Sequence, residues 1–153
     1  MLKIFLGGCI IAFASMLGRV FAYKYKRKRD FYIALEAFLQ HLKREISFSN
    51  QSLFSIISTA NIDNEDLSEY LSLFCRGEVV LPDFLQESER LMITSFFQKV
   101  GHCDRLNEVE LSLQFYKEIK ALREEESRRC DKYVGLSSRL GFFIGSIIFV
   151  VII

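Results

Sequence analysis

Hydrophobic residues gather at the two ends of this chain, and nearly all of its charged residues lie between them. Residues 4–17 and residues 140–153 contain no charged side chain. Counted from Leu2 to Ala22 and from Tyr133 to Ile153, each apolar stretch has 21 residues. That is about 31 Å of helix, which matches a hydrocarbon core of about 30 Å. We therefore predict transmembrane helices at residues 1–23 and 133–153.

Other interpretations of both ends stay open. Ala12 and Ala14 flank Phe13 in the small-x-small form of a signal-peptidase site, and residues 6–9 resemble a lipoprotein box with Cys9 as the lipid acceptor. The apolar stretch ahead of either position is very short, which favours a retained helix. At the other end, the alternative is a buried helix of a soluble protein. Residues 147–153 would be apolar on every face of a helix, which disfavours this alternative.

A basic cluster follows the first apolar stretch. It spans residues 24–29 and consists of Lys24, Lys26, Arg27, Lys28 and Arg29. Cations beside a membrane span are retained on the cytoplasmic side, and they attract anionic lipid head groups. The cluster therefore predicts that the middle of the chain is cytoplasmic and that both termini are extracytoplasmic. A nucleic-acid patch is the alternative, which a net charge of only +1 and the lack of a recognition module disfavour.

Small residues recur at every fourth position in both predicted spans. They are Ala14, Gly18 and Ala22 in the first span and Ser137, Gly141 and Gly145 in the second. This spacing lets helix backbones approach closely. It predicts helix packing in the membrane, either between the two spans or between copies in a homo-oligomer.

The middle of the chain has helical periodicity throughout. Three- and four-residue steps place one set of apolar residues on a single helix face: Phe31, Ala34, Leu35, Phe38, Leu42 and Ile46. No alternation typical of a strand occurs. Residues 30–132 therefore predict an all-α bundle of about five to six helices between the two spans.

Local signals divide the bundle into helices. Residues 49–52 interrupt the first helix, and Leu53 begins a short second one. Acidic residues at 61–65 suit the start of a third helix, which ends at Gly77. Pro82 and Asp83 predict the start of a fourth helix that ends at Gly101. Asp104 is predicted to cap a long fifth helix, whose charged residues 123–129 form a solvated stalk that leads into the second span.

The bundle is acidic. Residues 30–118 contain fifteen Asp or Glu against seven Lys or Arg. An acidic surface offers a docking site to a basic partner, although it is equally typical of a face that only keeps a protein in solution. The candidate partner contacts are Asp63, Glu65, Asp66, Glu69, Gly101 and Asp104.

Residues that support catalysis are not found in a productive pattern. His102, Cys103 and Asp104 are consecutive, whereas catalytic triads are assembled from distant parts of a chain. His41 and Glu45 are two ligands where a catalytic zinc site needs three. No phosphate-binding glycine loop, zinc-protease motif or nucleophile elbow occurs. We predict a protein that is not an enzyme, without metal, cofactor, nucleic acid or small-molecule substrate.

Three stretches resemble the stage III sporulation protein AB family. The first runs from Ala34-Leu35-Glu36 through Glu45-Ile46-Ser47-Phe48 to Leu53. The second is Gly101-His102-Cys103-Asp104 with the long helix that follows it. The third is Lys132-Tyr133-Val134-Gly135-Leu136, which leads into Gly141. With the apolar ends, the resemblance covers nearly the whole chain.

The resemblance implies a place in the assembly that endospore formers build across the mother-cell and forespore membranes. Its cytoplasmic part would resemble the helical domain of type II secretion and pilus platform proteins. The implied role is a scaffold in the mother-cell membrane that engages a secretion-type ATPase and other membrane subunits. The alternatives are a platform component of an ordinary secretion or pilus system and, from another class, a signal-anchored protein outside the cell.

Overall fold

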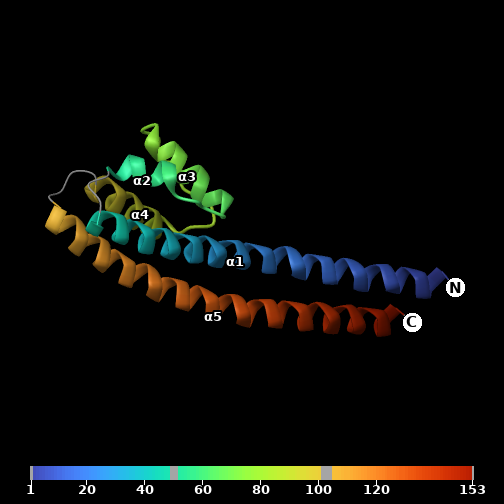
Figure 1. The fold of residues 1–153 in the computed structure, drawn as a ribbon. Helices are drawn as coiled ribbons and strands as arrows, with labels where there is room; N and C mark the ends of the chain where they lie inside the picture. The colour runs from blue at the N-terminus through green and yellow to red at the C-terminus, as the bar shows by residue number, and fades with distance from the viewer. Residues whose placement is uncertain (1, 49–51, 101–104, 153) are drawn as a thin grey trace. The chain divides into compact units, whose positions relative to one another are not determined.

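The computed structural model describes the backbone of residues 2–48, 52–100 and 105–152, and the side chains of most residues between 22 and 136. Over these residues the chain forms five helices and no strand (Figure 1). The all-α prediction is therefore confirmed. The helices are α1 (Leu2–Phe48), α2 (Leu53–Thr59), α3 (Glu65–Cys75), α4 (Glu87–Val100) and α5 (Arg105–Ile152).

The chain divides into two compact units. The terminal unit comprises Met1–Arg29 and Glu125–Ile153, and the central unit comprises Asp30–Glu124. The long helices α1 and α5 contribute to both units, whereas α2, α3 and α4 belong to the central unit alone. Each unit is described by itself below.

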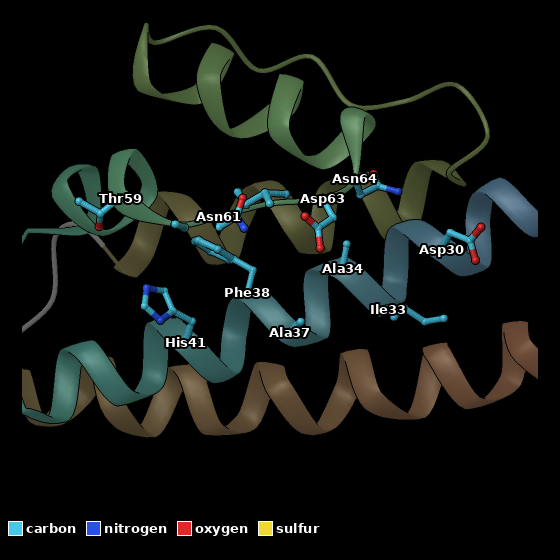
Figure 2. Close-up of a pocket in the computed structure, with 12 residues that line it drawn as sticks. Asp30, Ile33, Ala34, Ala37, Phe38, His41, Thr59, Asn61, Asp63 and Asn64 are labelled. Carbon is cyan, nitrogen blue, oxygen red and sulfur yellow. The ribbon is translucent and has the colours of Figure 1, made fainter.

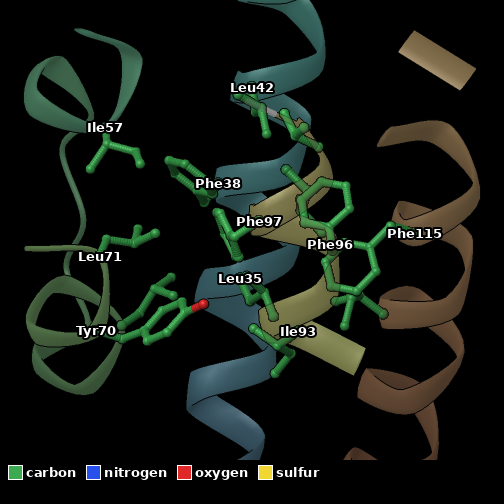
Figure 3. Close-up of a cluster of buried hydrophobic side chains, with 14 of the residues drawn as sticks. Leu35, Phe38, Leu42, Ile57, Tyr70, Leu71, Ile93, Phe96, Phe97 and Phe115 are labelled. Atoms are coloured by element: carbon green, nitrogen blue, oxygen red, sulfur yellow. The ribbon is translucent and has the colours of Figure 1, made fainter. Parts of the chain in front are cut away.

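The core of the central unit is rich in aromatic rings (Figure 3). Phe97 of α4 lies at its centre, with ring centroids 5.5 Å from Tyr70, 5.2 Å from Phe96 and 6.1 Å from Phe38. Phe96 in turn stacks on Phe115 of α5 at 3.9 Å. The apolar face predicted for residues 31–46 is buried here, except for Ala34, which is half-buried. Aromatic contacts from α1, α3, α4 and α5 thus hold this unit together.

The predicted starts of α2 and α3 are confirmed by their caps. The Ser52 hydroxyl accepts a hydrogen bond from the Ser55 N–H at 3.3 Å, and the Asn64 side-chain oxygen accepts one from the Leu67 N–H at 3.0 Å. Such caps satisfy backbone donors that the helix itself leaves unpaired. Both starts could be predicted because the cap and its partner are only three residues apart.

The predicted helix start at Pro82 is wrong. Pro82 instead begins a turn, closed by a hydrogen bond of 3.2 Å from the Leu85 N–H to the Pro82 carbonyl. Helix α4 begins at Glu87, because the Glu89 carboxylate accepts a 2.8 Å hydrogen bond from the Gln86 N–H. This is the acidic half of a capping box, and it fixes Gln86 as the residue before the first helical turn.

Gly77 ends α3 with a left-handed backbone. Its φ is 86°, and the N–H groups of Gly77 and Glu78 donate to the Phe74 and Leu73 carbonyls at 3.0 Å each. This double closure of a helix end requires a residue that tolerates positive φ, for which glycine has no steric cost. The end predicted at Gly77 is therefore explained by backbone conformation.

Replacing Gly77 with alanine is expected to destabilise the central unit by about 1–2 kcal/mol, because an L-residue with a Cβ is strained at positive φ. No atom lies within 4 Å of the added Cβ, so crowding does not contribute. Gly135→Ala is the matched control: its Cβ also meets nothing within 4 Å, but it lies inside α5, where alanine favours the helix. Chemical unfolding of the full-length variants measures both effects. Equal losses at the two positions would contradict the assignment.

The terminal unit is an antiparallel pair of helices. The rings of Tyr25 and Tyr133 stack with centroids 4.6 Å apart, and the Lys28 Nζ lies 3.1 Å from the Glu126 Oε1. Residues later in α1 thus contact residues earlier in α5, so the two helices run in opposite directions. The N-terminal end of α1 and the C-terminal end of α5 lie side by side (Figure 1).

The prediction of a solvated stalk over residues 123–129 is wrong in part. Glu125 and Arg129 form an exposed i,i+4 ion pair at 2.6 Å, as expected for such a stalk. Glu126, however, is buried, and it binds both Lys28 and Arg129, the latter at 3.4 Å. Lys28 is likewise buried, so it differs from the exposed Lys24 and Lys26 of the basic cluster. The stalk is therefore not fully solvated, because Glu126 of α5 forms a buried ion pair with Lys28 of α1.

Within the described part of the chain, no helical stretch combines the length and the apolar character needed to cross a membrane. The predicted spans at residues 1–23 and 133–153 lie largely outside the residues whose side chains are described. Of the small residues predicted to pack in them, only the half-buried Ala22 has a described side chain. The side chains of Ala14, Gly18, Ser137, Gly141 and Gly145 are outside the described ones.

Candidate functional site

A groove of about 800 Å³ opens on the surface of the central unit (Figure 2). Its floor is the face of α1 that carries Ile33, Ala37 and His41. Its wall is residues 59–64, which connect α2 to α3. The remaining lining residues are Asp30, Ala34 and Phe38 of α1, the last of them buried. The groove therefore joins an apolar floor to a polar rim.

The local sequence explains the shape of the groove. Ala34 and Ala37 are small, so they leave space above α1 where larger side chains would fill it. On the other side of this space, Ala60 and Asn64 have extended backbones, which end α2 and cap α3. Ile33 is 46% exposed.

The acidic residues predicted as partner contacts lie beside this groove. Asp63 lines it directly and is exposed. A second hollow of about 440 Å³ is lined by Asp63, Glu65 and Glu69, together with Ile62 and two serines of α3. Asp66 is half-buried and lines neither hollow. Gly101 and Asp104 lie outside the described residues, so the structure brings together three of the six predicted contacts.

A polar network joins α1 to α5 within the central unit. The Arg123 Nε donates to one Glu36 carboxylate oxygen at 2.8 Å, and the Tyr116 hydroxyl donates to the other at 3.2 Å. The Gln40 amide nitrogen donates to the same tyrosine hydroxyl at 3.1 Å. Hydrogen bonds to charged groups are stronger than neutral ones. The network therefore fixes the helix that forms the floor of the groove against α5.

Comparisons with protein-family models, with curated proteins and with solved structures found no match to this chain. The resemblance to the sporulation family thus stays a prediction from the residues that carry it.

The reactive side chains of the described residues do not form a metal centre. No three His, Cys, Asp or Glu side chains among them converge as ligands. His41 lines one end of the groove, four residues before Glu45 on α1. His102, Cys103 and Asp104 lie outside the described residues.

Burial weakens the acidity of two further groups in the central unit. It raises the pKa of the Tyr70 phenol, and the nearby Thr94 hydroxyl offsets part of that shift, although no hydrogen bond of ordinary geometry joins the two hydroxyls. Partial burial also raises the pKa of the Cys75 thiol above its ordinary value. Because the thiolate is the nucleophilic form, the raised pKa lowers the thiolate fraction of Cys75 at neutral pH.

The groove itself was not predicted from the sequence. Helical periodicity identifies residues that are buried within the chain, and Ile33 and Ala37 fall outside that stripe. The signal that points to them is the pair of alanines three residues apart beside an isoleucine that has no place in the core. What the arrangement presents is an apolar floor with exposed Ile33 and Ala37, and carboxylates at its rim.

Proposed function

We propose that this chain is a non-enzymatic scaffold subunit of a sporulation-specific, secretion-like membrane complex. Its apolar ends would form two spans in the mother-cell membrane, with the central unit in the cytoplasm and both termini outside. Its partners would be a secretion-type ATPase and other membrane subunits of the complex, including further copies of this chain.

The observation that supports this proposal is the antiparallel pairing in the terminal unit. The contacts of Tyr25 with Tyr133 and of Lys28 with Glu126 bring the two apolar ends of the sequence side by side. If both ends span the membrane beside each other, the chain crosses it once before and once after the central unit. All residues between the two spans then lie on the same side. The cations of residues 24–29 then favour the cytoplasmic side.

The topology is tested by thiol labelling in intact cells. In a chain that retains Cys75 as its sole cysteine, a membrane-impermeant maleimide is expected to label only after permeabilisation. Labelling at mildly alkaline pH offsets the raised pKa of this exposed thiol. The matched control is a chain in which Ile153→Cys provides the sole cysteine, which is expected to react in intact cells. Labelling of Cys75 in intact cells would overturn the cytoplasmic placement.

The biological role is tested separately. Deletion of the gene is expected to block spore formation and to leave ordinary secretion and pili unaffected, and the tagged full-length chain is expected to copurify with a secretion-type ATPase. Loss of pili or of secreted proteins with normal sporulation would instead favour the platform of an ordinary secretion system.

A further inference from the structure

The floor of the groove is an apolar face that the chain leaves uncovered. Ile33 is 46% exposed, and Ala37 beside it is exposed as well. Phe38 lies buried at the base of the same face (Figure 2). An apolar surface between one helix and one extended segment suits the apolar side chains of a helix at i, i+3 and i+4 spacing.

The charges at the rim of the groove all have one sign. Asp30 and Asp63 line the groove itself, and Glu65 and Glu69 line the second hollow that continues from Asp63 along α3. No Lys or Arg is among the residues that line either hollow. Such a rim attracts a segment that carries Lys or Arg, and it repels acidic segments, nucleic acid and anionic lipid.

We infer that the groove docks a basic amphipathic helix of a partner protein. This inference rests on the scaffold role proposed above and gives that role a recognition surface. The apolar side chains of the partner helix would cover Ile33 and Ala37, and its cations would face Asp63 and Glu69. The competing occupant is the basic segment 24–29 of a second copy of this chain, which has complementary charge too.

The occupant is identified by photo-crosslinking with the full-length chain in cells. A benzophenone amino acid at position Ala37 is expected to crosslink a segment of another protein. Mass spectrometry of the crosslinked peptide is expected to show apolar residues at helical spacing and an excess of Lys and Arg. Position Ala121 is the matched control, because it is an exposed alanine of the same unit that lines neither hollow.

The contribution of charge is tested with two pairs of neutralising substitutions. Asp63→Asn with Glu69→Gln is expected to lower the crosslinking yield about fivefold, the loss of two rim ion pairs. Both residues are exposed, and neither caps α3, which keeps Asn64 for that purpose. Glu87→Gln with Glu110→Gln neutralises two exposed acids outside the hollows and is expected to leave the yield unchanged.

Several outcomes would overturn the inference: a crosslinked peptide that is neutral or acidic, one that comes from a second copy of the chain, a yield at Ala37 no higher than at Ala121, or equal effects of the two charge pairs. These failures leave the scaffold role intact as long as Cys75 is protected in intact cells. Labelling of Cys75 there would instead overturn the cytoplasmic placement on which the proposed scaffold role rests.

Discussion

Replacing Phe97 with alanine is expected to destabilise the central unit by about 3–5 kcal/mol, the usual cost of deleting a buried aromatic ring from a core. Phe97 is 1% exposed, and rings from three helices surround it: Phe38 of α1, Tyr70 and Phe74 of α3, and its neighbour Phe96. Because the surrounding rings come from different elements, they cannot all move in to fill the cavity. Hydrogen exchange of the full-length protein, resolved by peptide, measures the loss in α1, α3 and α4.

The matched control for this prediction is Phe54→Ala. Phe54 also contacts Phe74, with centroids 6.3 Å apart, but it is 53% exposed. Its removal is expected to cost about 1 kcal/mol, because folding buries only part of the apolar area of this ring. Equal losses for the two variants would show that Phe97 is not the centre of the core.

Replacing Glu126 with alanine is expected to cost the terminal unit about 3–5 kcal/mol, because it removes the carboxylate that a buried ammonium faces. The side chains of Lys28 and Glu126 are only 10% and 5% exposed. Lys28→Met with Glu126→Leu removes both charges and is expected to recover most of the loss, since a buried ion pair has paid the desolvation of two ions. Hydrogen exchange over residues 24–29 and 126–133 of the full-length chain measures both.

The matched control is Glu125→Ala, which removes an exposed ion pair at the residue before Glu126. The Glu125–Arg129 pair is about half exposed on both sides, so its loss is expected to cost no more than about 1 kcal/mol. A double variant as unstable as the Glu126→Ala single variant would mean that the shape of the two side chains, and not their charge, matters at this position.

The parts of the fold that could be predicted from the sequence are those whose causes are local. The stripe from Phe31 to Ile46 follows from helix periodicity, and the caps at Ser52, Asn64 and Gly77 bond within three to five residues of themselves. The error at Pro82 has a local cause as well. Proline suits a first helical turn, but the Glu89 carboxylate caps the N–H of Gln86, four residues after Pro82, and the helix begins at Glu87 instead.

The features that escaped prediction depend on residues far apart in the sequence. Glu126 was assigned to a solvated stalk because its buried partner, Lys28, lies 98 positions earlier. Arg123 and Glu36 are separated by 87 positions. The groove needs α1 and the α2–α3 connection to face each other across an open space. Periodicity within one segment carries no information about such a pairing.

The burial of Cys130 has a further consequence for how the paired helices can be observed. Its thiol is 1% exposed in the terminal unit, one turn beyond Glu126 on α5. A thiol reagent therefore reaches it only in molecules whose helices have come apart. When closing is faster than modification, the rate of reaction divided by that of an open thiol equals the fraction of time the helices spend separated. The reactivity of Cys130 thus reports how often α1 and α5 separate in the terminal unit.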